Sequence, residues 1–265
     1  MSDITKTIHA VLWQIELEEK VRVIYACESG SRAWGFSSQD SDYDVRFLYL
    51  HPLEWYLSID DRREVIERPI TMGLDVNGWD IRKALRLFRK SNPPLFEWLG
   101  SPIIYFDQFT LATSLRRMAE TYYSPQACIY HYLHMAEGNY REYLKGETVW
   151  IKKYFYVLRP ILATKWIEQG YGVVPTEFKI LVDKLVINPS LHGEIDRLIA
   201  RKSQGDELAI GPRIPAISEF IETEIERLSS MKVKLTRNLA PIEELDKVFR
   251  QTLEEAWKGY ETCYS

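Results

Sequence analysis

The sequence has few cysteines, no long apolar run and no surplus of positive charge. Its three cysteines, Cys27, Cys128 and Cys263, are odd in number and widely spaced, which favours reduced thiols over a disulfide framework or a cysteine metal site. No apolar run is long enough to span a membrane, and the opening residues lack the character of a signal peptide. We therefore expect a cytoplasmic protein with no membrane partner.

Charge and histidine content narrow the function further. The formal net charge of −4 argues against broad coating of nucleic-acid phosphates, although it leaves room for a local basic cleft that grips one RNA end. The five histidines are scattered, and His131 and His134 have no evident third ligand nearby. An apolar content of 46% is typical of a soluble globular protein of one or two domains, and the chain shows no internal repeat or low-complexity tract.

The most informative stretch that the chain does contain is residues 21–50. Apolar and β-branched residues at 21–27 predict a buried strand, and residues 43–50 predict a second strand. Between them, Ser29-Gly30-Ser31 predicts a sharp turn that opens a short helix, because glycine permits such a turn. Backbone N–H groups at the start of a helix form a natural seat for phosphate, so we expect a phosphate group to bind at this turn.

Two acids stand at the start of the second expected strand. Asp42 and Asp44 are two residues apart, so on a regular strand they project from the same face. Adjacent carboxylates repel one another unless a cation lies between them. Oxygen ligands suit Mg²⁺, or Mn²⁺ in its place, and such ions partner readily with nucleotide phosphates. The stretch therefore predicts a phosphate seat and a metal site.

These residues resemble the signature of a known superfamily. Gly30-Ser31, a spacer of ten residues and Asp42-Tyr43-Asp44-Val45 are similar to the motif of polymerase-beta-like nucleotidyltransferases. The longer string ESGSRAWGFSSQDSDYDVRFLY resembles the narrower RlaP family, also called the YcgL-type predicted nucleotidyltransferases, and KSNPPLFEWL echoes the same family. The resemblance implies transfer of a nucleoside monophosphate from a nucleoside triphosphate to a hydroxyl group, with release of pyrophosphate.

Two other classes of enzyme also use acid pairs. Phosphatases of the haloacid-dehalogenase type carry Asp-x-Asp just after an apolar strand, whereas here the apolar run follows the pair. In Mn²⁺-dependent glycosyltransferases the pair also tends to end a strand, and they do not need the Ser-Gly-Ser turn. The order of elements disfavours both classes without excluding them, and a solvated strand edge is a less favoured explanation of the two acids.

The resemblance implies a third metal-binding carboxylate on a later strand, and two residues are candidates. Asp80 directly precedes IRKALRLFRK, an amphipathic helix for which it is the natural N-cap. Asp75 has no such local role and lies in an apolar strand, where a lone carboxylate is costly unless it binds something. We therefore predict that Asp75 is the third acid, which holds the catalytic metal and accepts, directly or through it, the proton of the attacking hydroxyl.

Two arginines near the motif leave alternatives open. Arg32 lies in the first turn of the short helix, where a cation opposes the helix dipole, so we predict that it contacts a bound nucleotide. An ion pair with Glu28 or Asp40 is the alternative. Arg46 shares a face with the acid pair on a regular strand, and it either holds one of the acids or touches phosphate.

The pattern changes from strands to long helical segments at about residue 108. We therefore predict an α+β fold, in which a small mixed β-sheet nucleotidyltransferase domain at residues 1–107 precedes an all-helical domain at residues 108–265. The expected helices and later strands of the two domains are residues 3–20 (helix), 64–67 and 70–79 (strands), and 110–122, 125–143, 147–169, 175–186, 189–202, 214–234 and 242–260 (helices).

One expected helix in the second domain combines cations with aromatic rings. Lys152, Lys153, Tyr156 and Arg159 include pairs three and four residues apart, which are neighbours on a helix surface. By resemblance to relatives whose helical domain closes the nucleotide cleft, Lys153 and Arg159 would bind the β- and γ-phosphates, and Tyr156 would contact the base or sugar. A helix with one core face and one solvated basic face explains the run equally well.

Three kinds of acceptor for the nucleotide fit the sequence. The family resemblance points to an RNA end, but a small molecule or a protein side chain fits the motif equally well. A hypothesis from another class is a non-catalytic nucleotide-binding or antitoxin-like protein that retains the fold, although the intact acid set argues against a decayed site.

Overall fold

The structure is a computed structural model, and it describes residues 3–206, 208–230 and 241–258. Strands and helices alternate in the first part of the chain, and helices dominate the second. The elements in chain order are α1 (Asp3–Glu19), β1 (Arg22–Glu28), α2 (Gly30–Trp34), β2 (Tyr43–Leu50), α3 (Leu53–Tyr56), β3 (Val65–Thr71), β4 (Leu74–Asp80), α4 (Ile81–Arg89), α5 (Pro93–Leu99), β5 (Ile104–Phe106), α6 (Leu111–Tyr122), α7 (Pro125–Tyr143), β6 (Thr148–Trp150), α8 (Lys153–Glu168), α9 (Phe178–Leu185), α10 (Pro189–Ser203), β7 (Ile210–Pro212), α11 (Pro215–Ser229) and α12 (Ile242–Trp257).

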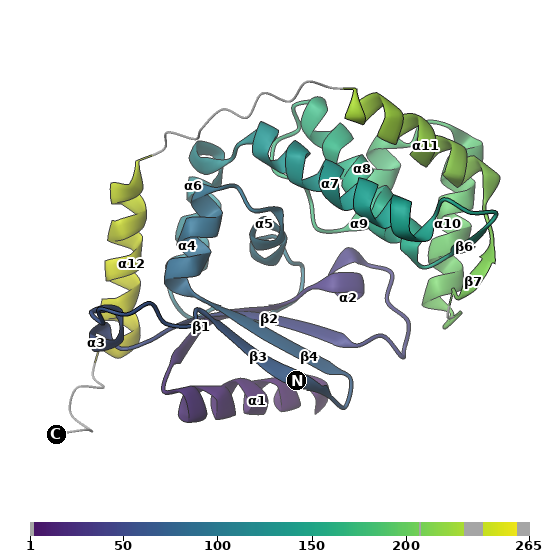
Figure 1. The fold of residues 1–265 in the computed structure, drawn as a ribbon. Helices are drawn as coiled ribbons and strands as arrows, with labels where there is room; N and C mark the ends of the chain where they lie inside the picture. Colours follow the sequence, from purple (N-terminus) through teal and green to yellow (C-terminus); the bar gives the residue numbers. More distant parts are fainter. Residues whose placement is uncertain (1–2, 207, 231–240, 259–265) are drawn as a thin grey trace.

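A mixed five-stranded sheet forms the centre of the first part, with strand order β3-β4-β2-β1-β5 (Figure 1). Strands β2 and β4 run parallel, and the other neighbouring pairs are antiparallel. In the β2–β4 register Asp44 stands directly opposite Asp75. The sheet therefore brings together two of the expected acids that are far apart in the chain.

The hairpin of β3 and β4 turns at a different place from the predicted one. The sequence predicts strands at 64–67 and 70–79 with Pro69 near their junction, but β3 continues through Pro69. The chain instead reverses at Met72 and Gly73, whose φ angles of 51° and 71° lie in the left-handed region. Proline is tolerated in β3 because this strand is the edge of the sheet, where a missing N–H breaks few ladder bonds.

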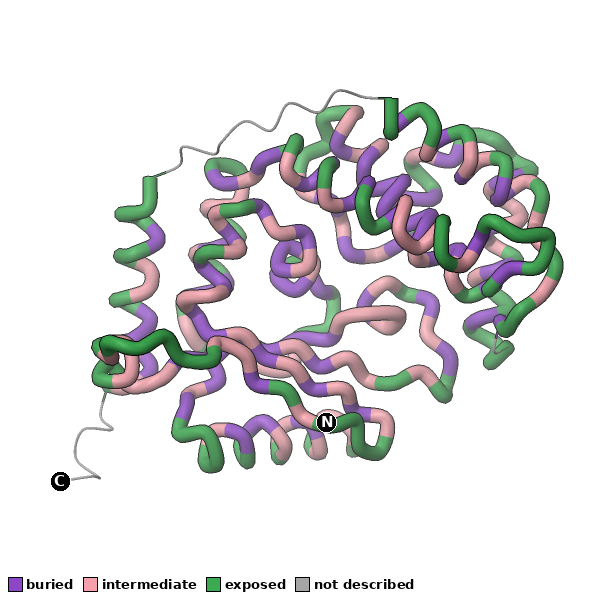
Figure 2. Tube along the Cα trace, viewed as in Figure 1, coloured by how far each residue is buried: buried purple, intermediate pink, exposed green. Residues whose placement is uncertain are grey.

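Helices cover both faces of the sheet (Figure 1). Helix α1 lies on one face, where Ile8, Leu12 and Ile15 are buried against strand residues. On the other face a second hydrophobic cluster joins strand residues to α4, α5, α6 and α12. Helix α12 buries one side and exposes the other (Figure 2). The domain boundary at residues 107/108 stays a prediction, and α6 and α12, which follow it in sequence, share their core with the sheet.

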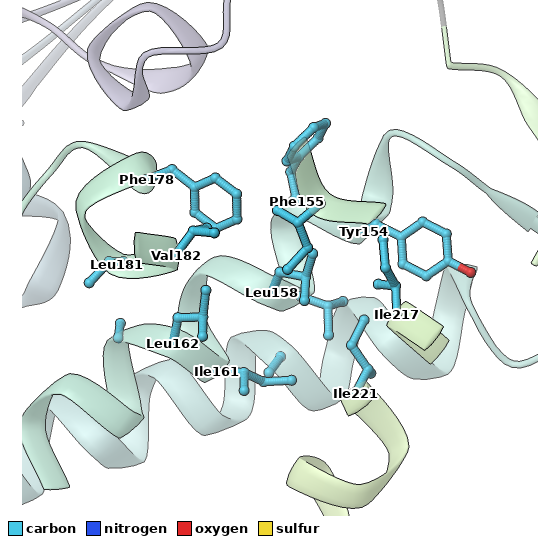
Figure 3. Packing of buried hydrophobic residues seen from close by; sticks show 14 of the residues in the cluster. Tyr154, Phe155, Leu158, Ile161, Leu162, Phe178, Leu181, Val182, Ile217 and Ile221 are labelled. Carbon is cyan, nitrogen blue, oxygen red and sulfur yellow. The ribbon is translucent and has the colours of Figure 1, made fainter. Parts of the chain in front are cut away.

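The second part of the chain is built around α8, which is buried on most sides (Figure 3). Helices α7, α9 and α11 contact α8, and Phe155, Leu158 and Leu162 lie at the centre of their shared cluster. Phe36, from the loop after α2, stacks on Phe155 with ring centroids 4.3 Å apart. The core of the second part therefore reaches the motif in the first.

The α+β class is confirmed, but the second part also contains a small ribbon that the sequence did not predict. The predicted helix at 147–169 begins later, at Lys153, because residues 148–150 form β6 and pair antiparallel with β7. Threonine, valine and tryptophan at these positions favour extended structure. Across the residues that the structure describes, no helix is long and apolar enough to cross a membrane.

The two last predicted helices correspond to α11 and α12. Their described parts end at Ser229 and Trp257, earlier than the predicted ends at 234 and 260. Those predicted ends lie outside the described residues.

Candidate active site

The turn at Gly30 lies directly against the side chain of Asp44. Gly30 has a φ of 57°, and a Cβ atom placed on it would lie 1.9 Å from Asp44 Oδ2. The Ser29 N–H donates to the carbonyl oxygen of Asp44 at 2.8 Å. Only glycine fits both the backbone conformation and the close approach. The turn and the acid therefore face each other, and Ser31 follows Gly30 in the first turn of α2.

Arg46 joins Asp44 to Asp75. Its Nη2 atom donates to Asp44 Oδ1 at 3.2 Å and to Asp75 Oδ2 at 2.7 Å, and its Nη1 donates to the Asp75 carbonyl oxygen at 2.9 Å. Burial raises the pKa of Asp44; Arg46 counteracts this rise, and the carboxylates of Asp75 and Asp42 add to it. Of the two roles that the sequence leaves open for Arg46, the structure shows the first, in which it holds the acids.

Asp42 lies just before β2 rather than within it. Its residue is exposed, and its Oδ1 would lie 3.6 Å from a Cβ placed on Gly73. Because β2 begins at Tyr43, strict strand alternation does not apply to Asp42. It is nevertheless close enough to Asp44 for the two charges to interact. All three expected acids thus lie at the start of β2 and β4, although only Asp44 and Asp75 share a partner.

Glu28 supports the acids from the end of β1, a role that sequence reasoning missed. It is 0% exposed, its Oε1 accepts the N–H of Asp44 at 2.8 Å, and its Oε2 accepts the hydroxyl of Tyr105. Burial raises the pKa of Glu28, and both of these hydrogen bonds oppose the rise. The sequence feature that could have revealed this role is a glutamate at the end of an apolar strand, because a buried carboxylate needs hydrogen-bond partners.

Arg32 has partners that the sequence did not suggest. Its Nη2 donates to the carbonyl oxygen of Ser41 at 2.6 Å, and its Nε donates to that of Asp42 at 3.2 Å. Within the described residues it forms no ion pair with Glu28 or Asp40 at a contact distance of 4.0 Å or less. Arg32 therefore fastens the loop before Asp42 to α2, and its contact with a nucleotide stays a prediction.

Asp80 is the N-cap of α4, as the sequence predicts. Its Oδ1 accepts the N–H of Arg82 at 2.8 Å, and its Oδ2 accepts the hydroxyl of Tyr56 at 2.7 Å. The side chain is buried, and burial raises its pKa to about 6. Both oxygens of Asp80 are thus occupied by the fold, which leaves Asp75 as the acid of β4 that faces Asp44.

Helix α8 places Tyr156 next to the motif. Burial raises the pKa of Tyr156, and the charge of Asp44 raises it further, so the two side chains are electrostatic neighbours. The Tyr156 ring meets the Trp34 ring edge-on, with centroids 5.8 Å apart. Lys153 Nζ lies 4.9 Å from the centroid of the Tyr156 ring. Tyr156 therefore contacts α2 through Trp34 and feels the charge of Asp44, and Lys153 lies over the rings of Tyr156 and Tyr143.

Arg159, which lies on the same helix, is engaged elsewhere. Its side chain is 3% exposed, and its Nη1 donates to Glu97 Oε1 at 2.6 Å. Glu97 also accepts the indole N–H of Trp34 at 3.4 Å, and the Arg159 guanidinium lies 4.8 Å from the Trp34 ring centroid. This buried ion pair ties α8 to α5 and α2. The structure does not bring Arg159 to the acids, so we leave it out of the proposed phosphate contacts.

A second cation next to the motif, Lys202 of α10, was missed by sequence reasoning. It is 9% exposed, and its Nζ donates to Ser38 Oγ at 3.5 Å, in the loop that precedes Asp42. Within the part of the chain that is described, it pairs with no carboxylate at 4.0 Å or less. Burial lowers its pKa and the nearby charge of Lys152 adds to the effect, whereas the charges of Asp40 and Asp206 oppose it. From the sequence it is an ordinary basic residue in the last turn of a helix.

The acids suit a divalent metal ion by their chemistry. Asp42, Asp44 and Asp75 offer the hard oxygen donors that Mg²⁺ prefers. The position of Arg46 Nη2 shows that a positive charge can contact both Asp44 and Asp75. As placed, however, no three His, Cys, Asp or Glu side chains among the described residues converge as metal ligands. A divalent ion would contact Asp44 and Asp75 together only in place of the Arg46 guanidinium.

The chain belongs to the RNA repair pathway DNA polymerase beta family (RlaP), whose family model matches residues 4–251. The resemblance seen in the motif is thereby confirmed. The chain is 50% identical over 248 residues to the uncharacterized protein YcgL of Bacillus subtilis (strain 168), which covers 93% of this chain and 95% of that protein. A solved structure of a nucleotidyltransferase-like protein from Exiguobacterium sibiricum 255-15 aligns with a TM-score of 0.32 and 11% identity, over 93% of this chain and 80% of that chain.

Proposed function

We propose that the protein is a metal-dependent nucleotidyltransferase that moves a nucleoside monophosphate from a nucleoside triphosphate to a hydroxyl group, with release of pyrophosphate. The observation that carries this proposal is the contact between the Gly30 turn and Asp44, with Asp75 directly alongside. A seat for phosphate and a pair of carboxylates meet at one point, which suits this reaction. Membership of the polymerase beta family supports the same class of chemistry.

The residues at the turn would bind the triphosphate. Backbone N–H groups around Gly30 and the hydroxyls of Ser29 and Ser31 are donors for phosphate oxygens, and Arg32 adds a positive charge. Asp42, Asp44 and Asp75 would hold Mg²⁺ or Mn²⁺, which when bound neutralises charge on the attacking and leaving oxygens. Asp75 would accept the proton of the attacking hydroxyl.

The helical part would position the other end of the nucleotide. Tyr156 is the side chain of α8 that lies near Asp44, so it is the proposed contact for the base or sugar, with Lys153 beside it. Lys202 takes the place that the sequence assigned to Arg159, because it is a buried cation without a counter-ion next to the loop before Asp42. We propose that it holds the end of the triphosphate.

The acceptor is proposed to be an RNA end, as the description of the family suggests. The test is incubation of the purified protein with each α-labelled nucleoside triphosphate, Mg²⁺ or Mn²⁺, and separate pools of RNA, protein and small metabolites. Label transferred to RNA, with release of pyrophosphate, supports the proposal. Asp44→Asn should abolish transfer, whereas Asp40→Asn, which removes an exposed acid of the same loop, should not. Label on protein or metabolites instead would replace RNA as the acceptor.

A second candidate is a non-catalytic nucleotide-binding protein, and Arg46 is the observation that favours it. Its guanidinium already pairs with both acids, so a nucleotide could bind without a catalytic metal. Calorimetry separates the two candidates. Triphosphate binding that needs no divalent ion, with no pyrophosphate from any of the four nucleotides, favours this candidate over the enzyme.

A further inference from the structure

A groove lies between α4, α12 and the start of α7, at the end of β4 that is remote from Asp75. Figure 1 shows α4 continuing from this end of the strand, with α12 beside it. The groove encloses about 590 Å³. Its lining combines cations of α4 and its C-cap with apolar side chains and one acid of α12 and with small residues at the start of α7: Arg82, Leu85, Arg86, Arg89, Lys90, Ser124, Ala127, Ile242, Leu245, Asp246 and Phe249.

The groove lining carries four cations, Arg82, Arg86, Arg89 and Lys90, and one acid, Asp246. Arg82 and Arg86 share one carboxylate, that of Glu64, each at 3.0 Å. Arg89 and Lys90 form no ion pair at 4.0 Å or less with any residue in the described ranges. The Nε atom of Arg89 is moreover buried without a hydrogen-bond partner. The whole chain has a net charge of −4, so this excess of positive charge is confined to the groove. An anion bound there would balance it.

The shape and periodicity of the groove indicate a chain of anions rather than a single one. Cations recur along α4 at Arg82, Arg86 and the Arg89–Lys90 pair, about one helical turn (about 5.4 Å) apart. Ser124 is the N-cap of α7, so the positive end of a 19-residue helix adds to the field. The apolar side of the groove includes Phe249, a half-buried ring that meets Tyr56 edge-on with centroids 5.0 Å apart, and bases stack on aromatic rings of this kind.

We propose that this groove binds single-stranded RNA, with the cations of α4 on successive phosphates and the apolar residues of α12 against the bases. A basic track beside apolar and aromatic surface is how proteins hold single strands. A run of carboxylates, as in polyglutamate, offers the same charge but has no rings for the apolar side. The groove would hold the RNA acceptor of the proposed reaction, and the choice of RNA as the ligand rests on that proposed function. Binding in the groove itself requires neither nucleotide nor metal.

The experiment measures the fluorescence anisotropy of a labelled single-stranded RNA of about 12 nucleotides, with the full chain in EDTA and without nucleotide. The variants are Arg89→Gln, Lys90→Gln and the double variant. Lys83→Gln is the matched control, because it removes the same charge from α4 at a position outside the groove lining, where Lys83 lies over Trp79. Salt titrations then count the phosphate contacts.

The double variant should bind at least about tenfold more weakly, and the slope of log K against log salt should fall by about 1.4, since each lost phosphate contact on a single strand removes about 0.7. Lys83→Gln should behave like the wild type. An unchanged slope in the double variant, or an equal loss in Lys83→Gln, overturns the proposal. Equal competition by polyglutamate also overturns it and points to an acidic peptide. Lys90 is exposed, so Lys90→Gln should fold even if Arg89→Gln does not.

Failure of this proposal is distinguishable from failure of the proposed function. Asp44→Asn should lose nucleotide transfer and keep RNA binding, because Asp44 lies at the opposite end of the sheet from α4. If RNA binding is lost in Asp44→Asn and retained in the double variant, the RNA binds at the acids, and the assignment of RNA binding to the groove is wrong.

Discussion

Strand β4 carries two aspartates whose surroundings differ in kind. Asp75 has a side chain that is 32% exposed, and its carboxylate is paired with the side chain of Arg46. Asp80 is 0% exposed, and its two oxygens accept a backbone N–H and a tyrosine hydroxyl. An acid whose bonds are all supplied by the fold has none left for a ligand. An acid held by one exchangeable cation can trade that cation for a metal ion.

The same contrast separates two buried cations of the helical part. Arg159 is neutralised by Glu97 and ties three helices together. Lys202 is almost as buried, but the only described hydrogen bond of its side chain is a long one to a serine hydroxyl. A buried charge that the fold leaves without a counter-ion is destabilising, and such groups are commonly retained for a ligand.

The largest effect expected from this comparison is on turnover in the two aspartate variants. Asp75→Asn removes the proposed metal ligand and proton acceptor, so we expect transfer to fall about a thousandfold, or about 4 kcal/mol of transition-state stabilisation. Asp80→Asn should stay within a few-fold of the wild type, because asparagine is also a good N-cap. Single-turnover assays of both variants check this. A folded Asp80→Asn protein with the greater loss would reverse the assignment.

The second effect is a pH dependence of stability that belongs to Asp80. Because burial raises its pKa from 3.8 to about 6, the folded state binds a proton more readily than the unfolded state. The stabilisation from that proton is complete below about pH 4 and is lost as the pH rises through about 6, which amounts to about 3 kcal/mol at most. Asp80→Asn should therefore exceed the wild type in stability at pH 8 and match it near pH 4.

Urea unfolding of both proteins across this pH range measures the difference. Arg82 N–H can still be capped by the asparagine oxygen, and Tyr56 can accept from the amide, so the substitution changes charge more than bonding. A constant gap between the two proteins at every pH would show that Asp80 does not titrate in this range.

The sequence predicts local features of this protein better than distant ones. The Gly30 turn, the following acids and the N-cap at Asp80 each depend on neighbours within a few residues, and the structure forms the turn and the cap. The bridge from Arg46 to Asp75 depends on the parallel register of β2 and β4, which no local pattern encodes.

The helical part shows the same limit. Arg159 has the spacing of a surface cation, and only the distant Glu97 makes it part of the core. Strand β6 likewise needs β7, some 60 residues further along, to pair with, so the periodicity of the surrounding segment predicted a helix instead. The burial of Lys202 could not be predicted from the sequence, because it depends on the distant loop that packs over this end of the helix.

The third prediction concerns the cation that holds Asp75. Arg46→Met removes the guanidinium that an incoming metal ion would displace, so we expect Mn²⁺ to bind about tenfold more tightly, or by about 1.4 kcal/mol. Electron paramagnetic resonance of free Mn²⁺ measures this without any turnover. Arg63→Met, which breaks an exposed pair with Glu67, is the control and should not change the affinity. Weaker binding in Arg46→Met would mean that Arg46 orients the acids for the metal.

The smallest effect expected is on the stability of Lys202 variants, and its sign is informative. Lys202→Met removes a buried charge that has no counter-ion, so we expect a gain of about 1 kcal/mol in the free energy of unfolding. The same variant should bind inorganic tripolyphosphate about tenfold more weakly in calorimetry, because the proposed contact is lost. Arg159→Met should instead lose stability, since it leaves Glu97 buried and unpaired. If Lys202→Met is less stable and binds tripolyphosphate normally, then Lys202, like Arg159, is a cation that stabilises the fold and does not bind phosphate.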